Sequence, residues 1–405
     1  MTTYWQFQGS APPQLTDSAR AVLKAIVSAG PATRPQLSAS LLFSKPTISV
    51  AVNELEGLGL VAPVGVSRGL LGRTPVTYGV GPNAGFIIGI DCGTTRVKAI
   101  ASRIDGTPAG KVEQSLGDQV GSDRYAVIEQ VVASLLAGPK PETGPLRGIA
   151  IALPNIISPS LDRLPDRDDF IPVLERLKSR YLVPILLENN VNCAALAEYH
   201  EGAAKDHSFS VYIQIGVKVG VGIVLEGRLF RGFRGGAGEI GHLPFPWSET
   251  EQPQWQRGET YLGAAALVER TRQAWPADEA PAPATTAELF DRFERSATAR
   301  AMVQRHARDI GNLAAACVSI LDPQLIVLGG GVGQNAVLLP GVEQVVRTLC
   351  WPVEIVVSQL SNQATVLGAV RLAIDFAMAR LLGEDGKAAF LYPGALTADL
   401  ISVSP

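Results

Sequence analysis

The sequence predicts a small helical domain that ends in a β-hairpin, followed by a larger α/β body made of two similar halves. Helical spacing of apolar residues and a turn-rich hairpin pattern fill residues 1–80. A buried strand, a glycine-rich turn and a second strand open residues 85–200, and the same order opens residues 201–385. Residues 386–405 show neither pattern, and we expect them to form an irregular tail.

Length and charge narrow the class of protein before any motif is considered. A chain of 405 residues is long for one domain and suits two or three folded units. Its net charge of −3 excludes a uniformly basic nucleic-acid-binding protein. The charge is uneven, because residues 1–80 hold six basic and three acidic side chains, which leaves −6 for the remainder. This asymmetry is consistent with an N-terminal part that binds nucleic acid.

The cysteines and apolar runs give no sign of disulfides, secretion or a membrane span. The four cysteines have no Cys-x-x-Cys spacing, so neither a disulfide framework nor a cysteine zinc knuckle is expected. The N-terminus lacks a basic segment followed by an apolar stretch, and no run approaches the roughly 20 apolar residues that cross a bilayer. We therefore expect a soluble, cytoplasmic protein without a membrane partner.

Three short helices are expected in the first 60 residues. Thr16 or Asp17 can cap the first helix, which Pro31 ends. Residues 33–41 suit a second helix, with proline tolerated in its first turn. The stretch Ser-Lys-Pro at 44–46 is a good start for a third helix, because serine caps it and proline fits its first turn.

The segment 61–80 contains two β-rich runs around a tip of glycine and arginine. Three helices and such a hairpin are typical of a winged helix-turn-helix, whose third helix lies in the major groove of DNA. Polar residues at the start and on the exposed face of that helix can contact phosphates and bases, and arginines of the tip can enter a minor groove. The candidate DNA-binding residues are Ser44, Lys45, Thr47, Ser49, Asn53, Arg68 and Arg73. The alternative is a helical cap on the body with solvated arginines.

The glycine-rich turns of the two halves are candidate phosphate-binding loops. In the first, Asp91-Cys92-Gly93-Thr94-Thr95, small residues let backbone N–H groups and hydroxyls approach a phosphate, and the aspartate can hold a metal ion. The second reads Gly216-Val217-Lys218. A single glycine turn is more often a plain hairpin, but the repeated order predicts duplicated halves with a ligand in the cleft between them.

A strand-to-helix junction at 187–202, LENNVNCAALAEYHEG, is a further candidate site. Amides and a carboxylate at such a junction usually face a ligand, because these loops carry function on a rigid scaffold. Asn190 cannot take a proton, so the junction can bind a ligand without supplying a base for catalysis.

Taken together, these motifs resemble the ROK family (repressor, open reading frame, kinase), part of the actin-like, hexokinase-type ATPase superfamily. The resemblance covers 16–385 and rests on GIDCGTT, ENNVNCAALAE, GGAGEIGHLPF, ETY at 259–261, LDPQLIVLGGGV and the hairpin tip GRTPV at 72–76. It implies an actin-like body of two lobes with a cleft, preceded by a winged helix in the repressor branch of the family.

The resemblance also implies a sugar site in the cleft. Carried over position by position, Asn189, Asn190, Glu239 and Glu259 bind sugar hydroxyls, and His242 helps to shape the pocket. Carboxylates and amides suit vicinal hydroxyls, which need donors and acceptors in fixed geometry. For Glu239 and His242, the alternative is a structural salt bridge.

Two departures from the family pattern argue against phosphoryl transfer. Family kinases carry aspartate as general base where Asn190 stands, and loss of a positioned base typically costs about 10²–10⁴-fold in rate. Their second phosphate loop reads Gly-Thr-Gly, whereas this chain has Gly216-Val217-Lys218. The vestigial phosphate loops then comprise Asp91, Gly93, Thr94, Thr95, Gly216 and Lys218.

We therefore expect a sugar-responsive transcriptional regulator, most often a repressor in this family, with a catalytically inactive kinase fold as its sensor. The alternative is an active ATP-dependent sugar kinase with an added DNA-binding domain. A third hypothesis is a regulator that ignores sugars and responds to a protein partner or to its own abundance. The implied partners are double-stranded operator DNA, a sugar or sugar phosphate effector, and further copies of the chain in a homodimer or homotetramer.

A structural zinc is not expected, and no other cofactor or metal is implied. The zinc loop of the family should fall near 250–257, where this chain reads TEQPQWQR, so that only His242 of the four usual ligands remains. Trp247 and Trp255 are the candidates for holding that loop instead. Lys218 suggests a phosphorylated effector, because an ammonium group there would bind an anion; the alternative is an ion pair with Asp91.

Overall fold

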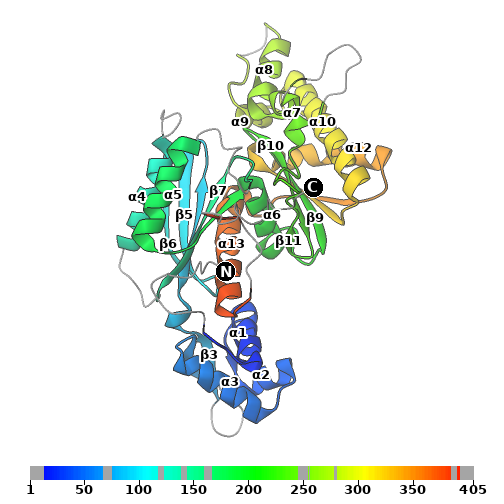
Figure 1. The fold of residues 1–405 in the computed structure, drawn as a ribbon. Helices are drawn as coiled ribbons and strands as arrows, with labels where there is room; N and C mark the ends of the chain where they lie inside the picture. The colour runs from blue at the N-terminus through cyan, green and yellow to red at the C-terminus, as the bar shows by residue number, and fades with distance from the viewer. Residues whose placement is uncertain are drawn as a thin grey trace, which may run out of the picture. The chain divides into compact units, whose positions relative to one another are not determined.

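The computed structural model describes residues 13–66, 75–116, 123–137, 144–158, 167–244, 254, 256–277, 281–384 and 390–392. The chain divides into two compact units (Figure 1). Unit 1 comprises Met1–Asn189 with Ala369–Pro405, and unit 2 comprises Asn190–Gly368. This division groups the N-terminal segment and the end of the chain with the first half of the body. Within the described ranges, no helix is long and apolar enough to cross a membrane.

The N-terminal part of unit 1 consists of three helices and a three-stranded antiparallel sheet of order β1-β3-β2. Its elements are α1 (Asp17–Ala29), β1 (Ala32–Thr33), α2 (Arg34–Leu41), α3 (Lys45–Gly57), β2 (Val61–Val66) and β3 (Val76–Val80). Thr16, Thr33 and Ser44 each accept a hydrogen bond from the backbone of the helix that they cap. The expected helices and hairpin are confirmed, while the hairpin tip with Arg68 and Arg73 lies outside the described residues.

The remainder of unit 1 contains a six-stranded sheet of order β14-β8-β7-β4-β5-β6. Its elements are η1 (Pro82–Ala84), β4 (Phe86–Cys92), β5 (Arg96–Arg103), β6 (Pro108–Ser115), α4 (Asp123–Ala137), β7 (Leu146–Leu153), α5 (Arg167–Tyr181), β8 (Ile185–Asn189) and β14 (Phe390–Tyr392), with α13 (Ala364–Leu381) entering from unit 2. Helices α4 and α5 bury one face of the sheet, where Ile88 and Ile90 point. Gly89 faces the opposite side, where a Cβ atom would lie 2.4 Å from the backbone nitrogen of Val370 in α13.

Unit 2 contains a five-stranded sheet of order β11-β10-β9-β12-β13. Its elements are α6 (Asn190–Glu201), β9 (Phe209–Ile215), β10 (Val219–Leu225), β11 (Arg228–Leu229), η2 (Ile240–His242), α7 (Arg257–Leu262), α8 (Ala264–Ala274), α9 (Thr286–Asp291), α10 (Ala297–Leu321), β12 (Leu325–Gly329), α11 (Gly330–Gly333), η3 (Ala336–Leu338), α12 (Leu339–Leu349), β13 (Glu354–Val357) and η4 (Ser361–Gln363). Helices α10 and α12 cover one face. Helix α6 packs on the other, where a Cβ atom at Gly222 would lie 2.5 Å from that of Ala195.

The predicted duplication is visible in the strand order of the two sheets. In unit 1, β4 pairs antiparallel with β5 and parallel with β7. In unit 2, β9 pairs antiparallel with β10 and parallel with β12. Each half thus starts with a hairpin, and the first strand of that hairpin also pairs in parallel with a strand from later in the chain. Because the two hairpins occupy equivalent places, their glycine-rich turns are also equivalent.

Candidate functional site

The junction between β8 and α6 lies at the boundary between the two units. Asn189 ends unit 1, where its backbone N–H donates to Oε1 of Glu188 at 2.9 Å and its side-chain nitrogen donates to the backbone oxygen of Asn155 at 3.1 Å. Glu188 itself is buried. These bonds fix the orientation of the Asn189 amide on the scaffold of unit 1. Asn190 begins α6 and is partly exposed.

Besides Asn190, three of the expected sugar-binding residues belong to unit 2, and two glycines bring their segments together. Glu239 precedes η2 and His242 ends it, whereas Glu259 lies in α7. A Cβ atom at Gly241 would lie 2.8 Å from Cγ of Glu259, and one at Gly258 would lie 3.0 Å from the backbone oxygen of Ile240. The absence of side chains at these glycines therefore lets Glu259 lie against the 239–242 turn.

All three of these ionisable side chains are partly exposed, as a ligand contact requires. Among the residues that the structure describes, no group of three or more histidine, cysteine or acidic side chains is arranged to hold a metal ion. Trp247 and Trp255, the expected supports of this region, lie outside the described residues.

The second glycine-rich turn, at 216–218, is bound into the surrounding structure. The backbone oxygen of Gly216 accepts a hydrogen bond of 2.8 Å from Ala264, the first residue of α8. The side chain of Val217 is 73% exposed, and Lys218 is partly exposed. A backbone oxygen of this turn thus stabilises the junction between α7 and α8.

The first glycine-rich turn keeps the polar groups that its sequence predicts. Thr94 and Thr95 are exposed, and Gly93 is partly buried. Loss of water around Asp91 raises the pKa of its carboxyl to about 6, although the charges of Lys98 and Arg96 act in the opposite direction. Asp91 therefore keeps a carboxyl group that can be protonated below neutral pH.

The candidate DNA-binding residues of α3 fall into two groups. Lys45 is exposed and Ser49 is partly exposed, so both side chains face away from the core of the N-terminal segment. Ser44 caps the helix, with its oxygen 3.2 Å from the backbone nitrogen of Thr47. Asn53 accepts a hydrogen bond of 2.7 Å from Arg34, a contact that the sequence does not indicate. Three of the five described candidates therefore already have a partner within the chain.

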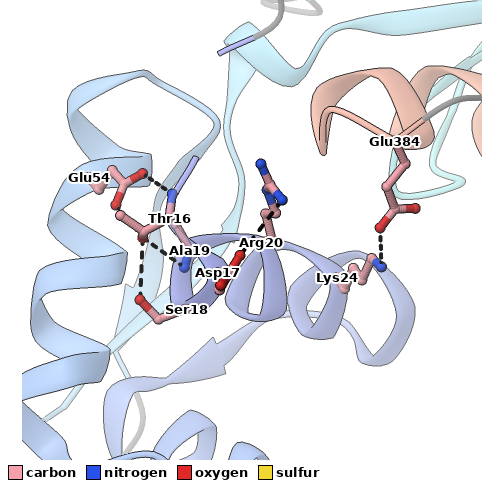
Figure 2. A network of polar contacts seen from close by, with 8 residues as sticks. All are labelled: Thr16, Asp17, Ser18, Ala19, Arg20, Lys24, Glu54 and Glu384. Atoms are coloured by element: carbon pink, nitrogen blue, oxygen red, sulfur yellow. Dashed lines mark hydrogen bonds and ion pairs between the residues drawn. The ribbon is translucent and has the colours of Figure 1, made fainter. Parts of the chain in front are cut away.

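Helix α3 is also tied to α1 by a carboxylate. Figure 2 shows Glu54 accepting hydrogen bonds from the backbone N–H of Thr16 at 2.9 Å and from its hydroxyl at 2.7 Å. The same figure shows Lys24 of α1 paired at 2.6 Å with Glu384, which follows α13. The N-terminal segment is thus fastened internally and also contacts the last helix of unit 1.

Two buried polar networks in unit 2 were not predicted from the sequence. Glu198, fully buried in α6, accepts hydrogen bonds from the hydroxyl of Ser358 and from the backbone of Ala203 and Leu360. The second network joins α7, α8 and α10 and is described below. The quoted motif ENNVNCAALAE contains Glu198, but two of its partners, Ser358 and Leu360, lie more than 150 residues later in the chain, so no local signal identifies them.

Comparisons with known proteins agree with this architecture. The model of the ROK family matches residues 87–376. A xylose repressor from Caldicellulosiruptor bescii is 26% identical over 381 residues, which cover 87% of this chain and 94% of the relative. That alignment is longer than the stretch 87–376, so it includes residues outside the family match.

Two solved structures of the family differ in how much of this chain they cover. A crystal structure described as the ROK family transcriptional regulator, homolog of the E. coli MLC protein, has a TM-score of 0.69 at 22% identity and covers 90% of this chain and 96% of its own. The ROK hexokinase from Thermus thermophilus has a TM-score of 0.58 at 26% identity and covers 71% of this chain and 97% of its own. The regulator thus matches more of this chain than the hexokinase does.

Proposed function

This chain belongs to the ROK family, and from this premise we propose that it is a sugar-responsive, DNA-binding transcriptional regulator, a repressor in the simplest case. The observation that carries the proposal is coverage. A repressor relative and a regulator structure match about nine-tenths of the chain, whereas a hexokinase of the family matches 71% of it. The additional match is what a DNA-binding segment in front of the kinase-like body would produce.

We propose that residues 1–80 form a winged helix-turn-helix domain and that α3 enters the major groove of operator DNA. The exposed side chains of Lys45 and Ser49 support this role. Ser44 and Thr47 would act at the helix start, where backbone N–H groups favour a phosphate. Asn53 would contact DNA only if it shared or left its bond with Arg34. Arg68 and Arg73 complete the proposal as minor-groove contacts.

We propose that the effector is a sugar bound by Asn189, Asn190, Glu239, His242 and Glu259. The contact between Gly241 and Glu259 supports this set, because it brings together two segments that are distant in the sequence. The fixed amide of Asn189 supports it too, since a preorganised group loses less conformational entropy on binding.

We further propose that the protein does not transfer a phosphoryl group to the sugar that it binds. Asn190 has no ionisable group to accept a proton from a sugar hydroxyl, and Val217 and Lys218 replace the hydroxyl and the glycine of a phosphate loop. A sugar kinase with an added DNA-binding domain is the second candidate function. It is favoured by one observation, the polar first turn with Asp91, Thr94 and Thr95.

The proposed regulator would act in the cytoplasm as a homodimer or homotetramer on a two-fold symmetric operator. An effector that binds one arrangement of the chain more tightly would shift the population of DNA-competent molecules. More specifically, we propose that the effector is a sugar phosphate whose phosphate group binds near Lys218. We propose no metal or cofactor for either role.

Two assays on the full-length protein test this function. A panel of sugars and sugar phosphates is screened for a rise in melting temperature, where a ligand at 100 times its Kd adds about 2.7 kcal/mol of stability. Random double-stranded DNA is then selected on the protein to find the sequence that it prefers. A regulator gives both a stabilising sugar and an enriched DNA sequence. Failure of both assays would contradict the proposal.

A further inference from the structure

A polar cluster in unit 2 joins the helix that carries Glu259 to its two neighbours. It consists of Tyr261 in α7, Arg270 in α8, and His306 and Asp309 in α10, and we call it the anchor cluster. The guanidinium carbon of Arg270 lies 4.2 Å from the centre of the Tyr261 ring, and the same guanidinium donates to the backbone oxygen of Tyr261. The Tyr261 hydroxyl donates to Oδ2 of Asp309 at 3.0 Å.

His306 is the buried end of this cluster. Nη2 of Arg270 lies 3.3 Å from Nδ1 of His306, which is fully buried. Burial, reinforced by the neighbouring guanidinium, lowers the pKa of His306 to about 3, so its ring is neutral near pH 7. Nδ1 therefore accepts the bond from Arg270, and Nε2 carries the proton.

The cluster leaves two buried nitrogens without a hydrogen-bond partner among the described residues, Nε of Arg270 and Nε2 of His306. Such groups typically cost about 1–3 kcal/mol each, so an apolar contact between α8 and α10 would cost less. The polar side chains instead fix the orientation of Tyr261, because Arg270 donates a hydrogen bond to its backbone oxygen and stacks on its ring. The arrangement restrains both the position and the rotation of α7.

The anchor cluster thus restrains a short helix. Helix α7 is six residues long and begins after Gln256, which is in the left-handed region at φ 54° and makes no side-chain cap hydrogen bond. Residues 250–257 contain neither cysteine nor histidine that would allow a metal to hold this stretch. After α7, Gly263 leads directly into α8, and the backbone N–H of Ala264 at the start of α8 donates to the backbone oxygen of Gly216.

We propose that Arg270 is a positioning residue for the effector site, which holds α7 through Tyr261 and His306 so that Glu259 faces the sugar. The inference rests on the proposed function, because it assigns Arg270 to the sugar site suggested above. Arg270 does not touch the ligand in this scheme. Its effect passes through two residues of one short helix, Tyr261 and Glu259.

A double-mutant cycle on the full-length protein tests this role, with the sugar that most raises the melting temperature of the wild type. Affinities are measured by titration calorimetry for wild type, Glu259→Gln, Arg270→Met and the double variant. If Arg270 positions Glu259, the glutamine substitution weakens binding by about tenfold in the wild type and by less than about threefold when Arg270 is already methionine. Equal effects in both backgrounds would overturn the proposal.

Control variants separate positioning from general destabilisation. Arg272→Met on the same helix removes an exposed arginine paired with Glu269 and should leave sugar affinity unchanged. Tyr261→Phe keeps the ring under Arg270 but removes the bond to Asp309, so it should give a milder version of the same non-additivity. It also replaces Arg270→Met in the cycle if that variant does not fold. If no sugar binds the wild type, the proposed function itself fails, and this inference fails with it.

Discussion

The two glycine-rich turns occupy equivalent places in the two halves of the body but differ in chemistry. The turn in unit 1 keeps a partly buried carboxyl at Asp91 and the exposed hydroxyls of Thr94 and Thr95. The turn in unit 2 exposes Val217 and uses the oxygen of Gly216 to hold the start of α8. Two equivalent hairpins therefore present different chemical groups at their turns, and the second turn supports a neighbouring helix.

This difference bears directly on function. Phosphoryl transfer needs both phosphate loops and a positioned base, whereas sugar binding needs only donors and acceptors in the right places. In the proposed function, unit 2 lacks residues suited to the first task, and Glu239, His242 and Glu259 serve the second.

The largest effect concerns ATP turnover. The wild-type protein should show no sugar-dependent ADP release, measured against ordinary kinase rates of about 1–100 s⁻¹. Asn190→Asp alone should not restore turnover, because the second turn remains altered. Detectable activity should first appear when Val217→Thr and Lys218→Gly are added to Asn190→Asp. Kinase-level turnover by the wild type would show that the second turn is still functional.

The pH dependence of stability should differ between the two units. His306 has a pKa lowered from 6.5 to about 3 in the folded state, so the unfolded chain binds more protons in this range. Its contribution is complete above pH 6.5 and is lost as the pH falls, by at most about 1.4 kcal/mol per pH unit. Chemical denaturation between pH 5 and 7.5 should show this slope, and His306→Gln should reduce it.

Asp91 should act in the opposite sense. Its pKa is raised from 3.8 to about 6, so its contribution is complete below pH 3.8 and is lost as the pH rises through 6. Asp91→Asn should therefore stabilise the protein more at pH 7.5 than at pH 5, as followed by melting temperature. An equal shift at both pH values would mean that Asp91 is not desolvated, and the contrast between the two turns would be weaker.

A smaller effect is expected at Lys218. If the effector is a sugar phosphate, Lys218→Ala should reduce the preference for the phosphate over the free sugar by about tenfold, because an ammonium group near the site binds an anion as a point charge. The comparison needs both ligands on both proteins. A preference that survives the substitution, or tighter binding of the free sugar, would remove Lys218 from the site.

The smallest effect lies in the N-terminal segment. Lys45→Ala should weaken DNA binding for all sequences alike and reduce the slope of log affinity against log salt by about one, if Lys45 contacts a phosphate. Fluorescence anisotropy at several salt concentrations measures both quantities. An unchanged slope would support the alternative in which this segment is a cap on the body.

Short-range signals in the sequence predicted the structure well, and long-range contacts were missed. The caps at Thr16 and Ser44 and the hairpin that opens each half of the body follow from neighbouring residues and spacing, and all are present. The bond between Arg34 and Asn53 joins residues 19 positions apart, and the contacts of the anchor cluster join residues 9 to 48 positions apart. Such pairs carry no local pattern, so only the folded chain shows which polar side chains are already engaged.

In the proposed function, a sugar alone changes the affinity of this protein for DNA. The most direct measurement is the anisotropy of a labelled DNA fragment, selected on the full-length protein, titrated with and without the stabilising sugar in the absence of ATP. The account predicts a change in affinity that is the same when ATP and magnesium are added, with the sugar recovered unmodified. No change with the sugar, or a change that needs ATP, would contradict it.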